Sequence, residues 1–571
     1  MRFQLTALCT GALQGGLFWW LWRTRKLVSW PATEPLLYTA LLYAVFAVPL
    51  VVYFTQGIER LPVWARRSAV AIYLMLYAAL GAYTAWSGGA TTGTNFDLNP
   101  ASVLAAAVLG FVSLSLFCGF DFEARRWDYA RLFNYTWRNG ILAVTAGAMT
   151  AAVWLVLLAG ANLMALIGLN GVLHLIEEPA FICVASATVF ASAFSLGLTR
   201  ASMAEAIRRF WLSISSWLLP LVLFFGVFWA VAVPFTGLEP LFKTKQAALI
   251  MLWFAALAVK FSNCAYQDGS IPAPYPAWLG RTLQTAWLSL LPMVGIAWWA
   301  LGLRVADHGL SEQRLWAGLV ATLAAIYAVG YSLSWLKRDR WMSAIARTNI
   351  AAAIILCLGL VALLTPVANV QRLGVSFHLQ HVAASDGATE PDWKYLRWRS
   401  GRFGREALHA IAEGQGAPAG GKWEKHAKDA LAQTDRHNNL PATLSEADVR
   451  ARLPVFPAQR ALPATFVKYV QTSRQDWLFQ RCFEPGASCV VWLGDLSNDG
   501  QDEILLFNYG QQAQGNVFIP FGETWKQAGH FSSRSSEGKF NNARVEAAQI
   551  AKPEWNDLMI DGRRIRLQMN P

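Results

Sequence analysis

Long apolar runs fill the first two thirds of the chain, and short polar stretches separate them. A transmembrane helix needs about 20 mostly apolar residues to cross the hydrocarbon core. Runs close to this length occupy residues 5–22, 36–55, 69–86, 101–120, 141–163, 180–198, 211–233, 246–265, 283–303, 315–333 and 349–364. The pattern therefore predicts a polytopic α-helical membrane domain of about eleven spans within residues 1–365.

The pattern changes after residue 365, where charged residues become frequent and the apolar runs shorten. Helices are predicted within residues 392–452, including one that opens at Ser445 with Asp448 as its capping partner. Residues 465–571 are predicted to be strand-rich. The expected strands are residues 466–470, 478–483, 489–493, 504–507, 517–519 and a hairpin of 558–560 with 565–569. Residues 366–571 are therefore predicted to form a C-terminal α+β domain.

Composition fits this division. Hydrophobic residues make up 55% of the chain and charged residues 15%, whereas a soluble chain carries about 25% charged residues. Lysine and arginine exceed aspartate and glutamate by ten in residues 1–365 and by two in the remainder. Because no basic stripe concentrates on a soluble face, nucleic-acid binding is disfavoured. The expected partner of the apolar runs is the lipid bilayer.

The charges of the loops predict the orientation, because cytoplasmic loops carry an excess of lysine and arginine. With the N-terminus in the cytoplasm, 17 of these residues fall on the cytoplasmic side and seven on the opposite side. Eleven spans then place the C-terminal domain outside the cytoplasm. Two of the cytoplasmic loops, residues 121–139 and 336–348, mix arginine with aromatic residues. This mixture favours anchoring in the headgroup layer over a surface for a cytoplasmic partner.

The predicted spans contain few residues that indicate chemistry. Lys260 is their one charged residue, and a proton-driven transporter normally needs a buried carboxylate. Pro220 and Pro292 predict kinks. Gly11 and Gly15 form a G-x-x-x-G pattern that suits close packing of two helices.

Acidic residues alternate along residues 495–503, between two apolar runs. A calcium loop needs oxygen ligands at positions one, three and five, a backbone carbonyl at seven and a further carboxylate. The matching residues are Asp495, Ser497, Asp499, Gln501 through its backbone carbonyl, and Glu503. An EF-hand is excluded, because its twelfth position is Leu506 instead of a glutamate. The pattern therefore indicates either a structural calcium site or a plain β-hairpin that turns at residues 498–500.

Cys482 and Cys489 are the two cysteines that lie outside the spans and their flanks. A Pro-Gly turn between two strands would bring them close enough to form a disulfide, and the alternative is a pair of reduced, buried thiols. Disulfides persist in oxidising compartments, so a bridge fits an extracytoplasmic domain.

Two groups of histidine and carboxylate residues are weaker metal candidates. His174 lies with Glu177 and Glu178 in a predicted outward loop, where a solvated loop is the favoured interpretation. His378 and His381 follow the last span, and two histidines alone cannot complete a metal site.

Four stretches of the chain resemble a family of bacterial multi-pass membrane proteins known as domain of unknown function 4153. They are the Leu-Gln-Gly-Gly segment at residues 13–16 and residues 303–316, 395–407 and 495–506. The resemblance implies a bacterial inner membrane, and it supplies no reaction, ligand or catalytic residue.

Three functions stay open from the sequence. The preferred one is a non-enzymatic envelope protein, whose outer domain binds a partner or senses conditions. The alternative is a transporter or lipid-handling protein with a polar cavity near Pro220, Pro292 or Asn162. The third, a membrane-embedded transferase, would rely on the group around His174.

Overall fold

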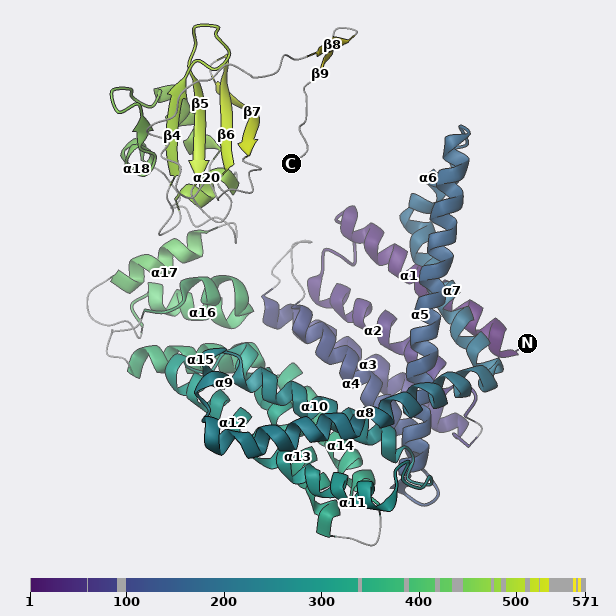
Figure 1. The fold of residues 1–571 in the computed structure, drawn as a ribbon. Helices are drawn as coiled ribbons and strands as arrows, with labels where there is room; N and C mark the ends of the chain where they lie inside the picture. The colour runs from purple at the N-terminus through teal and green to yellow at the C-terminus, as the bar shows by residue number, and fades with distance from the viewer. Residues whose placement is uncertain are drawn as a thin grey trace. The chain divides into compact units, whose positions relative to one another are not determined.

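The computed structural model of the protein describes residues 2–58, 60–89, 99–336, 341–384, 390–415, 422–433, 445–473, 477–483, 489–508, 514–522, 524–532, 558–560 and 563–565. The chain divides into two units, Met1–Ala407 and Leu408–Pro571. The first unit is helical and the second combines helices with a sheet (Figure 1).

The helices of the first unit are α1 (Arg2–Lys26), α2 (Pro35–Thr55), α3 (Val63–Gly88), α4 (Pro100–Gly119), α5 (Tyr129–Leu166), α6 (Gly171–Glu177), α7 (Pro179–Thr199), α8 (Ala201–Thr236), α9 (Glu239–Lys243), α10 (Ala247–Tyr266), α11 (Ala277–Ala286), η1 (Trp287–Ser289), α12 (Leu290–His308), α13 (Glu312–Leu336), α14 (Ile345–Leu364), α15 (Val370–Ala384) and η2 (Tyr395–Arg399). A short hairpin of β1 (Phe120–Asp121) and β2 (Arg126–Trp127) joins α4 to α5. The boundary between the two units falls within α16 (Gly401–Ala412).

Ten helical segments in the described part of the chain are long and apolar enough to cross a membrane. They are α2, α3, α4, α5, α7, α8 from Glu205, α10, the run from α11 to α12, α13 and α14. These segments overlap ten of the eleven predicted spans, so the chain has the helices of a multi-pass membrane protein. The first predicted span lies in α1, which is less apolar than the others.

The break between α11 and α12 has a local cause in Pro292. Proline has no N–H to donate, and its ring crowds the carbonyl four residues earlier, which here belongs to Leu288. The chain forms the 3₁₀ turn η1 at this point, so the interruption expected at Pro292 is present. Pro220 lies inside α8, and that helix continues through it.

The buried side chains of the first unit form two main cores. One core lies among α8 and α10–α13, and it contains Trp287 and Tyr331, whose ring centroids are 4.8 Å apart. The other lies among α1–α5, α7 and α14, and it contains Tyr53 and Phe194, whose ring centroids are 5.9 Å apart. The cavities described below lie at the edges of these cores.

Glycine allows α1 to pack against α7 at backbone contact. A Cβ on Gly11 would lie 2.8 Å from the backbone oxygen of Ala187, and a Cβ on Gly15 would lie 2.5 Å from the Cα of Val184. The later glycine of α1 meets the earlier part of α7, so the two helices are antiparallel. The G-x-x-x-G pattern is therefore a helix-packing motif, as the sequence predicted.

Residues beyond the last span remain part of the first unit as far as Ala407. Arg405 donates to the carbonyl oxygen of Gly88 at 3.2 Å and also to that of Gly89, at the end of α3. The guanidinium of Arg402 lies 4.5 Å from the centre of the Trp86 ring. These contacts explain why the unit ends later than the change in composition at residue 366.

The second unit contains a five-stranded sheet in the order β3-β4-β5-β6-β7, in which β3 is parallel to β4 and the other neighbours are antiparallel. Its described elements are α17 (Lys422–Ala432), α18 (Glu446–Arg452), β3 (Val455–Phe456), α19 (Ala464–Thr472), α20 (Trp477–Cys482), β4 (Cys489–Gly494), β5 (Glu503–Asn508), β6 (Gln514–Phe521), β7 (Thr524–Ser532), β8 (Leu558–Ile560) and β9 (Arg563–Ile565). Figure 1 shows β4 to β7 side by side. Phe466, Phe479 and Phe518 pack together in the core of this unit.

Two predicted strands of this unit are helices. Residues 466–470 lie in α19 and residues 478–483 coincide with α20 almost completely. Short apolar runs do not distinguish a strand from a buried helix. In α19 the buried residues are Phe466, Val467 and Val470, a spacing of one and four that marks one face of a helix.

Three predicted strands and one predicted helix start of this unit are confirmed. The strands at 489–493, 504–507 and 517–519 are confirmed as parts of β4, β5 and β6, and the capping box of Ser445 and Asp448 opens α18. β8 and β9 pair antiparallel, while the turn at residues 561–562 and residues 566–569 lie outside the described residues.

Candidate functional site

The acidic loop, residues 495–503, connects β4 to the first residue of β5. These strands are antiparallel, and Gly494 pairs with Glu503 where the loop leaves and rejoins the sheet. Asn498 and Gly500 have φ values of 59° and 82°, and asparagine and glycine are the residues that adopt this left-handed conformation most easily. The turn expected at residues 498–500 is therefore present.

Three carboxylates of the loop converge. Asp495, Asp499 and Glu503 each offer an oxygen, and these oxygens all lie within 4.8 Å of one another. Glu503 is only 4% exposed, and its Oε2 accepts hydrogen bonds from the backbone N–H of Leu496 at 2.5 Å and of Ser497 at 3.3 Å. The loop backbone thus folds around the Glu503 carboxylate.

Backbone donors hold the other two carboxylates as well. Asp495 accepts from the N–H of Asp499 at 3.1 Å through Oδ1 and from that of Gly500 at 2.9 Å through Oδ2. Asp499 accepts from the N–H of Gln501 at 2.8 Å. Converging carboxylates repel one another when ionised, and a hard cation with oxygen ligands removes that repulsion. The three-carboxylate cluster could therefore hold a metal ion.

The five predicted ligands are not equally placed. Asp495, Asp499 and Glu503 come together as the spacing predicted. Ser497 and Gln501 are exposed, and their oxygens as ligands stay a prediction. Asp502 pairs with Arg460, which neutralises the fourth carboxylate of the loop outside the cluster.

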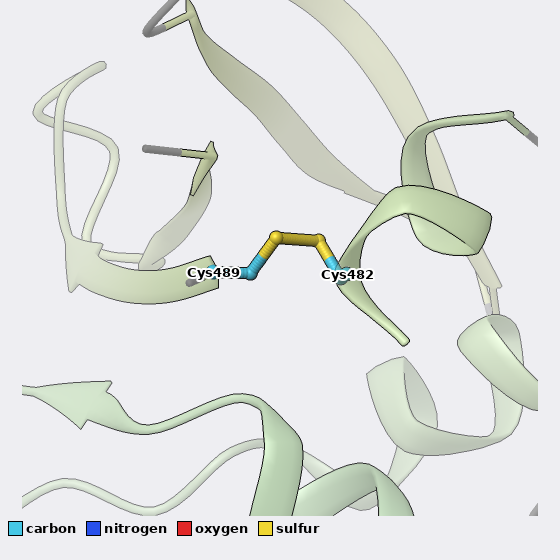
Figure 2. The surroundings of a disulfide bond; sticks show 2 residues. All are labelled: Cys482 and Cys489. Atoms are coloured by element: carbon cyan, nitrogen blue, oxygen red, sulfur yellow. A yellow bond between two sulfur atoms is a disulfide. The ribbon is translucent and has the colours of Figure 1, made fainter. Parts of the chain in front are cut away.

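Cys482 and Cys489 lie at bonding distance, with an S–S separation of 2.02 Å and a Cα–Cα separation of 5.3 Å. Figure 2 shows the bridge joining the end of α20 to the start of β4. The sequence placed it between two strands, and the first partner is instead a helix. Because β4 runs from Cys489 to Gly494, the bridge holds one end of the strand and the acidic loop follows the other.

A second group of polar residues lies in the first unit, where η2 and α15 approach the start of α13. These residues line a pocket of about 270 Å³, which we call the juxtamembrane pocket. Its charged and titratable members are Glu312, Arg314, His378, Asp392, Tyr395 and Arg399.

The surroundings of His378 in this pocket favour its neutral form. Its Nε2 accepts a hydrogen bond from the backbone N–H of Asp392 at 3.0 Å, and burial lowers the pKa of the imidazole below its ordinary value of 6.5, although the Asp392 carboxylate opposes the shift. Sequence reasoning considered His378 only with His381 and missed its grouping with Glu312 and Asp392, because those residues are far apart in the chain.

The group of His174, Glu177 and Glu178 is exposed around the end of α6. Among the described residues, the carboxylates and histidines close enough together to share a metal ion are those of the acidic loop. The structure brings no metal cluster together at His174 within that part of the chain.

A cavity of about 310 Å³ lies between the two cores of the first unit, and we call it the inter-core cavity. Two of its lining residues, Asn263 and Asn349, are joined by a hydrogen bond of 2.5 Å. Asn349 also accepts from the Tyr331 hydroxyl at 2.5 Å and donates to the Tyr129 hydroxyl at 2.8 Å. Aromatic rings, including that of Phe133, form much of the wall.

The inter-core cavity therefore combines apolar walls with a few convergent hydrogen-bonding groups, which is typical of small-molecule sites. Its lining does not include Pro220, Pro292 or Asn162, where the sequence placed a transport cavity.

No protein-family model matches the chain, and neither the search of curated proteins nor that of solved structures finds a match. The resemblance to the family of unknown function therefore stays a prediction.

Proposed function

We propose that this protein is a non-enzymatic protein of the bacterial inner membrane, whose second unit lies outside the cytoplasm and binds a partner or senses conditions there. The observation that carries the proposal is the bridge between Cys482 and Cys489. Disulfides persist in oxidising compartments and are rare in the cytosol. The bridge therefore supports the side that the loop charges predict for this unit.

The packing of α1 supports an eleventh span. It lies antiparallel to α7, which is long and apolar enough to cross a membrane. Gln14, in the middle of α1, donates to the carbonyl oxygen of Val45 at 3.1 Å within α2. A helix that pairs in this way with two spans crosses beside them, and eleven spans put the two ends of the chain on opposite sides.

Calcium is the metal that we propose for the acidic loop. Asp495, Asp499 and Glu503 supply only oxygen ligands, which calcium prefers. Its role would be structural, because the loop joins β4 to β5 and a bound ion would fix the ends of both strands. Free calcium is plentiful outside the cytoplasm, which fits the proposed side.

The test of sidedness is labelling of thiols in cells. A permeant alkylating agent first blocks all free thiols, an impermeant reductant then opens exposed disulfides, and an impermeant maleimide reports the new thiols. We expect label on intact cells, only after reduction, and none in the Cys482→Ser, Cys489→Ser double variant. Label that requires permeabilised cells would place the unit in the cytoplasm and refute the proposal.

The inter-core cavity favours a second candidate function, which is transport or handling of a lipid or other small amphipathic molecule. Asn263 and Asn349 offer amide groups within an otherwise apolar and aromatic wall. Ala353 also lines this cavity, whereas Ala328 is 2% exposed in the core. If the cavity admits solutes, Ala353→Cys reacts with a soluble maleimide faster than Ala328→Cys. Equal rates would count against this function.

A further inference from the structure

A third cavity, of about 320 Å³, lies where α5 and α8 begin and α7 ends, and we call it the two-arginine pocket. Arg138 and Arg208 line it together with Glu205. With two guanidinium groups and one carboxylate, the lining carries a formal charge of +1.

The partners of Arg138 in the described part of the chain are neutral. Its Nη2 donates to the backbone oxygen of Phe54 at 2.9 Å, and both Nε and Nη2 donate to Oδ1 of Asn139, at 3.1 and 2.9 Å. The guanidinium also lies 5.0 Å from the centre of the Tyr135 ring. Among the residues that the structure describes, no carboxylate forms an ion pair with Arg138. A partly buried cation without a counter-ion is costly, so this position favours an anion.

Arg208 is held beside it by a carboxylate and an amide. Its Nη2 donates to Glu205 at 2.8 Å and its Nη1 to Oδ1 of Asn134 at 2.7 Å. Its Nε is buried, and no other described residue accepts its proton. The side chain is 19% exposed, so this donor is withdrawn from water. The second arginine therefore also has hydrogen-bonding capacity that the protein leaves unused.

Two other loop arginines, Arg131 and Arg209, differ from these two. Arg131 pairs with Asp121 at 3.0 Å. Arg209 is 73% exposed, and its Nε lies 3.9 Å from Glu205, further than the 2.8 Å that separates Arg208 from the same carboxylate. Their charges are met by a carboxylate or by water. General orientation of the membrane helices by loop charge accounts for such residues, but it does not account for two partly buried guanidiniums around one cavity.

The apolar side of the pocket indicates the rest of the ligand. Ile141 and Leu142 follow Arg138 one turn further into α5, and Leu198 lies in the last turn of α7. α5, α7 and the part of α8 from Glu205 are each long and apolar enough to cross a membrane. The pocket thus has its charged groups near the ends of these helices, and Ile141 and Leu142 lie deeper along α5. A phospholipid presents its phosphate and its acyl chains in the same order.

We propose that the two-arginine pocket binds the phosphate group of a phospholipid, with an acyl chain against Ile141, Leu142 and Leu198. Guanidinium groups bind phosphate oxygens through charge-assisted hydrogen bonds, and basic pockets between membrane helices bind anionic headgroups. The phosphate supplies the anion that Arg138 lacks, and it would lie beside the guanidinium of Arg208. The site needs no function of the second unit.

The test uses the full-length protein in an uncharged detergent and measures its melting temperature against added ligand. The probes are dioleoyl phosphatidylglycerol, dioleoylglycerol, which lacks the phosphate, and inorganic phosphate, which lacks the chains. We expect saturable stabilisation by phosphatidylglycerol alone. Because hydrogen bonds to charged groups are the stronger ones, Arg208→Gln and Arg138→Gln should each raise the half-saturating concentration about tenfold or more.

Arg209→Gln is the matched control, because it removes an arginine from the next position of the same helix outside the pocket. It should leave the half-saturating concentration unchanged. Stabilisation by dioleoylglycerol as strong as that by phosphatidylglycerol would overturn the role of the phosphate, and an equal effect of inorganic phosphate would identify a soluble ligand instead of a lipid. If Arg138→Gln does not fold, the three probes on the unaltered chain and the pair of Arg208 and Arg209 variants still decide.

Discussion

Replacement of Gly15 by alanine adds one methyl group at a backbone contact between α1 and α7. The new Cβ would lie 2.5 Å from the Cα of Val184 and 2.6 Å from the backbone oxygen of Cys183. Ordinary contact begins at 3.4 Å, so the helices would have to separate by about 0.9 Å at this point. Both neighbouring atoms belong to the backbone, and no rotation of a side chain relieves the overlap.

Gly16 supplies the matched control, because a Cβ at that position has nothing within 4 Å. Both substitutions gain the higher helix propensity of alanine, worth about 1 kcal/mol in water, so this contribution largely cancels between them. Overpacking of a close contact costs about 1–3 kcal/mol. Gly15→Ala should therefore be less stable than Gly16→Ala by about 1–3 kcal/mol.

Unfolding of the two purified variants in the same detergent measures this difference, by heat or by a denaturing detergent. Gly11→Ala should behave like Gly15→Ala, since its Cβ would meet α7 at 2.8 Å. Equal stability of Gly15→Ala and Gly16→Ala would show that α1 is not held against α7. The support that this packing gives to an eleventh span would then be lost.

Three further outcomes follow from the other sites. Calcium at 100 times its dissociation constant should stabilise the unaltered chain by about 2.7 kcal/mol, and Glu503→Gln should abolish this stabilisation. Asp502→Asn should retain it, because Asp502 pairs outside the cluster. Loss of the stabilisation in both variants would contradict the site. Asn349→Leu should lower the free energy of unfolding by about 1–2 kcal/mol. Asn162→Leu should lower it by less, because the hydrogen bond of Asn162 in the described part of the chain is to Leu158 of its own helix; denaturant unfolding compares the two variants. Because the pKa of His378 is lowered in the folded chain, the unfolded chain protonates this imidazole first as pH falls. Stability should therefore be full above pH 6.5 and decline as pH falls below it. Melting scans across this pH range should show a shallower decline for His378→Gln.

The sequence predicted the membrane helices well because each has to bury a long apolar surface in lipid. That requirement produces an apolar run of about 20 residues, which can be recognised without knowing which helices pack against it. It also predicted that the helix carrying Gly11 and Gly15 packs closely against another helix, because close packing requires small residues at a regular spacing. That the partner is α7 came from the structure. The convergence of the three carboxylates in the acidic loop was predictable for a similar reason, since Asp495, Asp499 and Glu503 lie within nine residues of one another.

Local patterns failed where long-range packing decides the structure. Residues 466–470 contain aromatic and β-branched side chains, which favour strands. They form a helix because Phe466 packs against Phe479 and Phe518, which are supplied by α20 and β6. Strand β3 has only two residues, Val455 and Phe456, and it pairs with β4 more than 30 residues later. A strand of two residues has no hydrophobic pattern of its own from which it could be predicted.

The polar pockets of the membrane unit were missed for a different reason. Arg138, Asn263 and Asn349 all lie close to the ends of apolar runs, where a polar side chain can reach the headgroup layer and needs no partner. Sequence reasoning therefore treats such residues as solvated. In the folded chain the two asparagines bond each other across 86 positions of sequence, and Arg138 bonds a carbonyl 84 positions earlier. Polar residues near span ends thus become informative only when the folded chain shows that they face one another. This is why the inter-core cavity and the two-arginine pocket were identified from the structure.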